Sequence, residues 1–296
     1  MTQTKQQIQQ LLTSAGITAN KRFGQHFLID LNLMRLLIEV AHIRNNDVVL
    51  EVGCGTGSLT EGLSEYAGKV IAVEVDKTLA NIAERQLEKK ENVRIINADI
   101  LKSKHNLNQS VIGAIESARK KYNGRMLLVA NLPYNAACPV IMNLITGPTI
   151  ADAMYVTVQK EVAERMTAVA GGKDYGLLSI FLSSAGDVKT ERVLKPTVFW
   201  PQPRVDSAMV SFVRSSEKIS RIKDVGLFSE VVNLFMGHRR KMLQSCTKFA
   251  QGKPAGIDNW PEIFKRCGLD SRKRPEQTSP EDYIAITNLC CEQLNA

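Results

Sequence analysis

The sequence lacks several features that would assign it to common classes of protein. No apolar run reaches the roughly 18–20 residues that a helix needs to cross a bilayer. The amino-terminal stretch "MTQTKQQIQQLLTSAG" is polar and has no apolar core of a signal peptide. There is no C-x-x-C pair, and only four histidines could help to complete a zinc site. We therefore expect a cytoplasmic chain with no membrane span and no metal.

The six cysteines form no recognisable framework. They stand at positions 54, 138, 246, 267, 290 and 291. In an intracellular chain of this length such cysteines are reduced thiols, some of them buried. The adjacent pair Cys290–Cys291 is expected to lie on a terminal helix without a special role.

The chain is basic, and this favours a polyanionic partner. It has 38 Lys and Arg against 30 Asp and Glu, which gives a formal charge of +8. Nucleic acid is the natural candidate, because basic side chains neutralise phosphates and release counterions. Charge alone does not decide this, since many basic proteins bind no nucleic acid. With 296 residues, 44% of them hydrophobic, the chain is long enough for one large domain or for one large domain with a second, smaller one.

Runs with strand character alternate with helical segments between residues 47 and 159. Strands are predicted over 47–53, 69–75, 93–99, 125–134 and 152–159, and helices over 57–67, 77–90 and 108–122. This alternation predicts right-handed crossovers and a parallel sheet that is covered on both faces. The fold class is α/β with a Rossmann-like arrangement.

The flanking segments extend this prediction. A short amphipathic helix is predicted over 4–16, capped by Thr2 or Thr4 and stopped by Gly16, and another over 30–43. Two β-rich runs, 187–196 and 207–214, are expected to pair antiparallel at one sheet edge. Beyond them the chain is helical, with helices predicted over 225–246, 259–268 and 279–294. We expect an α/β domain over 1–217 and a small helical domain that contacts RNA or the ribosome over 218–296.

A glycine-rich loop, "EVGCGTG", follows the first predicted strand of the α/β domain. Gly53, Gly55 and Gly57 permit backbone angles and close approaches that side chains would block. The dinucleotide fingerprint G-x-G-x-x-G is not met, because position 58 is Ser. The acid Glu51 stands just before the loop and suits a ligand with an ammonium and a sulfonium group. S-adenosylmethionine is the cofactor that fits.

Two more acids stand at the ends of successive predicted strands. Glu74 comes about 20 residues after the glycine loop, where a carboxylate can hold both hydroxyls of a ribose. Asp99 ends the next strand and could accept a hydrogen bond from an adenine amine. Either acid alone could be a helix cap or a surface charge. Together with the loop they indicate a pocket for a nucleoside cofactor.

The fourth predicted strand ends in "NLPYN", residues 131–135. The Asn131 carbonyl and a neighbouring main-chain carbonyl could accept hydrogen bonds from an exocyclic base amine and free its lone pair for attack. Pro133 would fix the backbone, and Tyr134 could stack on a base removed from its helix. No general base is evident, so positioning would supply most of the catalysis. The alternative is an ordinary Asn-x-Pro turn after a strand.

The sequence resembles the ribosomal RNA adenine dimethyltransferases, and in particular the bacterial enzymes that act near the 3′ end of small-subunit rRNA. The matching stretches run in family order from about residue 21 to 286, and they are "KRFGQHFLID", "EVGCGTGSLT", "VEVD", "NAD", "NLPYN", "YGLLSI", "FWPQPRVDSAMV", "HRRKML" and "RPEQTSPEDYIAI". Cys54 departs from the proline usual in relatives, which should alter loop stiffness more than chemistry.

The resemblance implies an activity and a partner. The activity is transfer of four methyl groups from S-adenosylmethionine, two to each of two adjacent adenines in the 3′-terminal hairpin loop of 16S rRNA, with S-adenosylhomocysteine as the product. The partner would be small-subunit rRNA in an immature 30S subunit, coupled to its biogenesis. Nothing in the sequence points to an obligate dimer, so a monomer is expected.

The resemblance also implies roles for residues at matching positions. The cofactor site would comprise Gln25, His26, Leu28, Glu51, Gly53, Gly55, Gly57, Glu74, Val75, Asp99, Ile100 and Asn131, and the target base would meet Asn131, Leu132, Pro133, Tyr134 and Phe199. His26 is interpreted as a binding or lid residue rather than a catalytic base. Phe199 would close over the target base, although on its residue type alone it would be a core or loop aromatic.

Basic side chains are assigned to RNA contact. They are Lys21, Arg22, Arg204, Arg239, Arg240, Lys241, Arg272, Lys273 and Arg274. The clusters "HRRK" and "SRKR" could instead belong to solvated helix faces.

Three rival functions share parts of this pattern. One is a methylase of a single adenine in large-subunit rRNA, of the kind that confers macrolide resistance. Another is a ribosome assembly factor that binds without methyl transfer, against which the intact "NLPY" argues. The third is a DNA adenine methylase, which would leave the carboxyl-terminal match unexplained.

Overall fold

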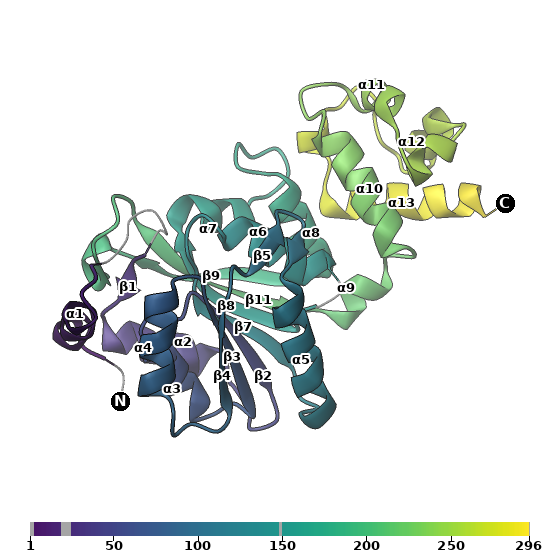
Figure 1. The fold of residues 1–296 in the computed structure, drawn as a ribbon. Helices are drawn as coiled ribbons and strands as arrows, with labels where there is room; N and C mark the ends of the chain where they lie inside the picture. Colours follow the sequence, from purple (N-terminus) through teal and green to yellow (C-terminus); the bar gives the residue numbers. More distant parts are fainter. Residues whose placement is uncertain (1–2, 19–24, 148–149, 296) are drawn as a thin grey trace. The chain divides into compact units, whose positions relative to one another are not determined.

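The computed structural model describes residues 3–18, 25–147 and 150–295. Contacts within the chain divide it into two compact units (Figure 1). We call residues 1–163 and 189–213 the sheet unit, and residues 164–188 and 214–296 the helical unit. The segment 164–188, which the sequence assigned to the first domain, thus clusters with the helical residues. The boundary after residue 217 remains a prediction about domains.

A seven-stranded sheet forms the centre of the sheet unit, in the order β4-β3-β2-β7-β8-β11-β9. The strands are β2 Val48–Val52, β3 Lys69–Glu74, β4 Val93–Asn97, β7 Met126–Asn131, β8 Ala153–Gln159, β9 Gly186–Leu194 and β11 Ser207–Arg214. The pairs β3–β4, β2–β3, β2–β7 and β7–β8 are parallel, whereas β11 runs antiparallel to β8. The predicted parallel sheet is confirmed, and β9 and β11 are neighbours at one edge.

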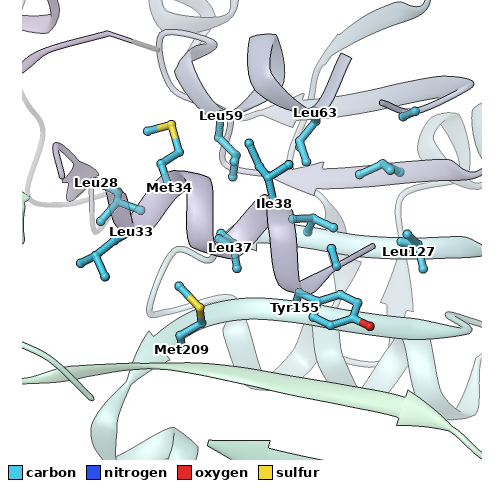
Figure 2. Packing of buried hydrophobic residues seen from close by; sticks show 14 of the residues in the cluster. Leu28, Leu33, Met34, Leu37, Ile38, Leu59, Leu63, Leu127, Tyr155 and Met209 are labelled. Carbon is cyan, nitrogen blue, oxygen red and sulfur yellow. The ribbon is translucent and has the colours of Figure 1, made fainter. Parts of the chain in front are cut away.

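Helices follow the strands. They are α2 Leu31–Val40, α3 Ser58–Ser64, α4 Lys77–Gln86, α5 Gln109–Lys121, α6 Ala137–Thr146 and α7 Lys160–Met166. Helices α2 to α5 match predicted helices, whereas α6 and α7 were not predicted. Figure 2 shows Leu37 and Ile38 of α2 packed between α3 and the sheet, near Leu63 and Tyr155. The Asp30 carboxylate caps α2 by accepting hydrogen bonds from the first turn. These contacts cover one face of the sheet.

The opposite face of the sheet is also buried. Side chains alternate along a strand, and Leu50 and Leu128, the neighbours of the residues that face α2, are fully buried as well. Helix α5 contacts β2 and β3. Burial on both faces explains why these strands are almost entirely apolar, as parallel strands are.

Short elements complete the sheet unit. Helix α1, Lys5–Ser14, begins at a capping box made by Thr4 and Gln7, so Thr4 is the cap. Sequence reading missed the short antiparallel pairs, which are β1 Phe27–Leu28 with β10 Phe199–Trp200 and β5 Leu101–Ser103 with β6 Asn106–Leu107, and the 3-10 turn η2 Pro196–Val198. Strands of two or three residues carry too little periodicity to be recognised.

The helical unit is built around an aromatic core. Its helices are α8 Leu177–Ala185, α9 Ser216–Ser220, α10 Val225–Met236, α11 Leu243–Cys246, α12 Trp260–Arg266 and α13 Pro280–Leu294, with 3-10 turns η3 Thr247–Phe249, η4 Lys253–Gly256 and η5 Pro275–Gln277. Phe235 of α10 contacts the rings of Trp260, Phe264 and Tyr283. Helix α8 packs on α10 through an edge-to-face contact of Phe181 with Phe228 at 5.6 Å, which explains why 164–188 clusters with this unit.

The continuous helix predicted over 225–246 is wrong. Helix α10 ends at Met236, and a turn through Gly237 separates it from the short α11. The glycine favours a helix end, and the polar "HRRK" stretch after it offers no apolar side chain to the core. The basic cluster therefore lies in a turn and not on a helix face.

All six cysteines are free thiols, as expected. Within residues 3–18, 25–147 and 150–295, no helix combines the length and apolar character needed to span a bilayer. The same residues hold no group of three or more His, Cys, Asp or Glu side chains placed to bind a metal ion.

Candidate active site

A cavity of about 350 Å³ lies at the carboxyl ends of the central strands of the sheet unit. Its lining includes the predicted cofactor residues Gln25, His26, Leu28, Glu51, Gly53, Gly55, Glu74, Val75, Asp99, Ile100 and Asn131, together with Leu132, Pro133 and Tyr134. Of the predicted cofactor and target-base residues, all of which are described, Gly57 and Phe199 do not line this cavity. Strand ends of a parallel sheet are where such folds bind ligands.

Glycine is required at two positions of the loop because other groups lie too close. A Cβ atom at Gly53 would come within 2.7 Å of Pro133 Cγ, and one at Gly55 within 2.8 Å of Phe27 Cε1. Both glycines have positive φ, 76° and 58°. The loop is therefore held between the "NLPY" turn and the segment before α2. Gly57, also at positive φ, begins α3 outside the cavity lining.

Glu74 ties the loop to the second strand of the site. One carboxylate oxygen accepts a hydrogen bond from the Gly55 amide at 2.9 Å, and the other accepts one from the Asp76 amide at 3.0 Å. Burial raises the pKa of this carboxyl, and the two amides oppose that effect. Each oxygen keeps a further lone pair, so the side chain can still accept a ligand hydroxyl.

Glu51 differs from Glu74 because it has an unused oxygen. It is 2% exposed, and its Oε2 atom has no hydrogen-bond partner. Desolvation by burial raises the pKa of this carboxyl to about 8. An orphaned carboxyl in a cavity wall is suited to receive a cationic group, which would favour its ionised form.

Asp99, the acid that follows β4, is in a different environment. Asp99 is exposed, and its Oδ1 accepts a hydrogen bond from the Leu101 amide at 2.9 Å. Beside it in the cavity wall are the buried Ile100 and the exposed Val75. Two apolar side chains and an accessible carboxylate form a suitable surface for a planar adenine.

Asn131 is held by contacts on both sides of its amide. Its Nδ2 donates to the His26 carbonyl at 2.7 Å, and its Oδ1 accepts a short hydrogen bond from the Thr157 hydroxyl. The Leu132 amide donates to the Thr157 carbonyl at 3.1 Å. The orientation of the amide is thereby fixed, with a lone pair of Oδ1 left for another donor.

Tyr134 is fixed in a similar way. Its hydroxyl lies 2.7 Å from Ser207 Oγ, and its ring stacks on His26 with centroids 5.2 Å apart. The His26 Nδ1 in turn lies 2.6 Å from the Pro201 carbonyl. His26 therefore packs against the "NLPY" turn, and its role as a binding or lid residue stays a prediction.

The prediction for Phe199 needs correction. Its side chain is 1% exposed and packs in the hydrophobic core with Leu28 and Leu33. It is paired through β10 with Leu28 in β1 and does not line the cavity. Closing over a base would require this ring to leave the core. Its position in the core agrees with the interpretation that its residue type alone suggested.

Sequence reading missed several residues that support the site. Thr157 and Ser207 hold Asn131 and Tyr134 from β8 and β11, and the only available signal was a buried hydroxyl residue in a largely apolar strand. From the amino terminus, Gln3 Nε2 donates to the Thr56 carbonyl at 3.1 Å, and the Thr56 hydroxyl donates to Gln3 Oε1 at 2.6 Å. Ile8 of α1 also lines the cavity.

These residues fit S-adenosylmethionine. Gly53 and Gly55 line the cavity, the orphaned Glu51 oxygen suits an ammonium group, and Glu74 suits ribose hydroxyls. The cavity lies beside Asn131 and Tyr134, so the same space reaches the proposed position of a target amine.

The predicted RNA-contact residues fall into separate groups. Lys21 and Arg22 lie outside the described residues, and Arg204 is exposed. In the helical unit, Arg239 pairs with Glu276 at 2.9 Å and Arg272 with Asp270 at 3.2 Å. Within the described part of the chain, Arg240, Lys241, Lys273 and Arg274 are exposed and form no ion pair. "SRKR", like "HRRK", lies in a turn rather than on a helix face.

The fold and the cavity define a Rossmann-like methyltransferase with a pocket for S-adenosylmethionine. The sequence model of the family described as "Ribosomal RNA adenine dimethylase" matches residues 16–290. The chain belongs to this family.

Relatives and solved structures agree with that membership. The chain is 35% identical to "Ribosomal RNA small subunit methyltransferase A" of Pediococcus pentosaceus, over 94% of this chain and 92% of the relative. It is also 35% identical to the protein of the same name from Geobacillus kaustophilus, over 94% of this chain and 93% of the relative. Its fold is similar to a dimethyladenosine transferase of Plasmodium falciparum, with a TM-score of 0.72, 21% identity and coverage of 90% and 98%. Its fold is also similar to that of the 23S rRNA methyltransferase ErmE, with a TM-score of 0.62 and 21% identity, over 91% of this chain and 100% of that one.

Proposed function

We propose that this protein dimethylates the N6 amines of two adjacent adenines in the 3′-terminal hairpin loop of small-subunit rRNA. The donor is S-adenosylmethionine and the product is S-adenosylhomocysteine. The substrate is an immature 30S subunit, the protein acts as a cytoplasmic monomer, and no metal takes part. Similarity to curated small-subunit methyltransferases over almost the whole chain supports the choice of substrate.

The observation that carries the proposal is the way in which Asn131 is held at the cavity. Thr157 and the His26 carbonyl fix both ends of its amide, and Pro133 follows it against the glycine loop. A fixed Oδ1 can accept a hydrogen bond from an adenine amine and draw its lone pair out of conjugation with the ring. Such a prepared acceptor needs no reorganisation when the reaction occurs.

The remaining residues have roles in binding and positioning. When bound, the cofactor supplies an electrophilic methyl group next to a positive sulfur. Glu51 receives the ammonium group, Glu74 the ribose and Asp99 the adenine of that cofactor. Tyr134, backed by His26, stacks on the target base once the base has left its stack. In-line placement of amine and methyl group then supplies most of the acceleration.

The test is transfer of labelled methyl by the wild type and Asn131→Ala. Substrates are unmethylated small subunits, large-subunit rRNA and duplex DNA, and nucleoside mass spectrometry identifies the products. We expect dimethyladenosine at paired adenines of small-subunit rRNA, and a fall in kcat of roughly a thousandfold in the variant, the upper range for one donor or acceptor of this type.

A matched control is Asn46→Ala, an exposed asparagine that contacts Asn123 and should leave transfer unchanged. Methylation of large-subunit rRNA or DNA instead would change the substrate that we propose. Binding of small subunits without any transfer by the wild type would favour an assembly factor and remove the catalytic roles.

A further inference from the structure

An exposed aromatic ring stands among the basic side chains of the helical unit. Phe249, at the end of η3, is 44% exposed, and Met242, which precedes α11, is 41% exposed. A single exposed apolar side chain needs no explanation by itself. Phe249 is distinguished by its basic surroundings, since the Lys241 ammonium lies over its ring and the ring stands outside the aromatic core of this unit.

The ring of Phe249 is supported from within the protein. It stacks on the His238 ring with centroids 4.1 Å apart and planes inclined by 14°. The His238 Nδ1 lies 3.0 Å from the Leu234 carbonyl of α10, which fixes the imidazole. The Lys241 ammonium lies 5.4 Å from the Phe249 centroid. We call His238, Lys241, Met242 and Phe249 the aromatic platform.

The two basic clusters meet beside this platform. The Leu243 amide donates to the Lys273 carbonyl at 2.9 Å, and the Gln244 amide donates to the Ser271 carbonyl at 3.0 Å. These bonds bring the turn after α10 next to the turn before η5, although the two are about thirty residues apart in the sequence. The backbone that carries Arg240, Lys241 and the platform is thus hydrogen-bonded to the backbone that carries Lys273 and Arg274.

We propose that Phe249 is a stacking platform for an unpaired base of ribosomal RNA. An aromatic face bordered by unpaired cations is the combination by which proteins hold single-stranded nucleic acid: bases stack on the ring while basic groups neutralise the phosphates. The cations around the ring favour a polyanion over an apolar protein surface as the partner. The inference rests on the proposed function, because it takes the RNA to be the substrate.

The test compares Phe249→Ala, Phe249→Leu and Phe249→Trp in equilibrium binding at several salt concentrations. The probes are protein-free small-subunit rRNA, and a single-stranded and a fully paired oligoribonucleotide of equal length; whole small subunits are tested separately for a protein partner. Loss of one stacked base weakens binding by roughly 5- to 150-fold. We expect Ala and Leu to weaken binding of the two probes with unpaired bases by about tenfold, Trp to retain it, and the salt dependence to stay unchanged.

The matched control is Tyr66→Ala, which removes an aromatic residue 52% exposed in the sheet unit and should bind like the wild type. Equal weakening on single-stranded and duplex RNA would overturn the inference, as would wild-type affinity in Phe249→Leu or a loss seen only with whole subunits, which would indicate a ribosomal protein partner. If the wild type methylates small subunits and the Phe249 variants bind normally, this inference alone fails. If the wild type transfers no methyl, the proposed function fails.

Discussion

Polar side chains in the cavity of the sheet unit are held by hydrogen bonds within the protein, whereas most basic side chains in the turns of the helical unit are exposed. In the cavity, Glu74 has a backbone donor on each carboxylate oxygen, and Asn131 is bonded at both ends of its amide. In the turns, Arg240 and Lys241 are exposed and lack ion-pair partners among the described residues.

The difference follows from what each region has to bind. Methyl transfer requires the amine and the methyl group at a fixed separation. Hydrogen bonds therefore hold the cavity side chains in place before the ligand binds. Phosphates need charge more than fixed geometry, and long basic side chains can adapt to a variable backbone. Changes in the cavity should therefore alter kcat or cofactor affinity, and changes in the turns should alter affinity for RNA and its dependence on salt.

The largest effect among tests of this comparison is expected from Thr157→Val. The substitution keeps the shape of the side chain but removes the hydroxyl that donates to Asn131 Oδ1. An unpaired buried acceptor costs about 1–3 kcal/mol, so we expect kcat to fall by roughly 10- to 100-fold with little change in cofactor Kd. Single-turnover kinetics and calorimetry separate the two quantities.

Thr157→Ser retains a hydroxyl and should restore most of the rate. If Val and Ser variants have equal rates, the hydroxyl does not orient Asn131, and the rigidity that we ascribe to the cavity would lose its main support.

A smaller effect, dependent on pH, is expected from Glu51. Its pKa of about 8 in the folded protein exceeds the usual 4.5, so the folded chain holds a proton that the unfolded chain releases. The associated stability is fully present below about pH 4.5 and is lost as the pH rises to about 8. Glu51→Gln should remove this loss, and denaturant unfolding at pH 5 and 8 measures it.

The same carboxyl should link cofactor binding to pH. An ammonium group favours ionised Glu51, so wild-type affinity for S-adenosylhomocysteine should rise by up to about tenfold between pH 6 and 7. In Glu51→Gln the affinity should be weaker and nearly flat with pH. Glu65→Gln, which changes an exposed acid, is the control. A flat profile in the wild type would mean that Glu51 does not receive the cation.

The smallest effect in ordinary buffer is expected from Arg240→Ala with Lys241→Ala. Loss of two phosphate contacts should weaken RNA binding by about fivefold and reduce the slope of log K against log salt by roughly 1.4 to 1.8. Catalysis at saturating RNA should be unchanged. Arg239 is a less informative target than the sequence suggested, because Glu276 already pairs with it.

Lys265→Ala with Arg266→Ala removes the same charge from α12, where Arg266 pairs with Glu292 at 3.0 Å. If both double variants flatten the salt slope equally, net charge rather than the basic turns governs binding. The contrast with the cavity would then rest on long-range electrostatics alone.

Local patterns were sufficient for much of the fold and the site. The strands, most crossover helices and the parallel direction of the strands follow from the alternating pattern, and the cofactor residues share a cavity because parallel strands end at one edge. The prediction of a continuous helix through residues 237–242 was wrong because the apolar periodicity of α10 was extended over a turn. The site residues missed were Thr157 and Ser207, whose roles depend on which strand lies beside β7 and β8, a fact that no local pattern contains.

The sequence by itself determined the fold class, the glycine loop, the strand-end acids and the "NLPY" turn, because these depend on period, conformational freedom and charge along a short stretch of chain. Only the tertiary structure decided that Phe199 is buried, that Glu51 has an orphaned oxygen and that two basic turns meet beside Phe249. Each of these depends on contacts between residues far apart in the sequence, whose energies arise only once the chain has packed.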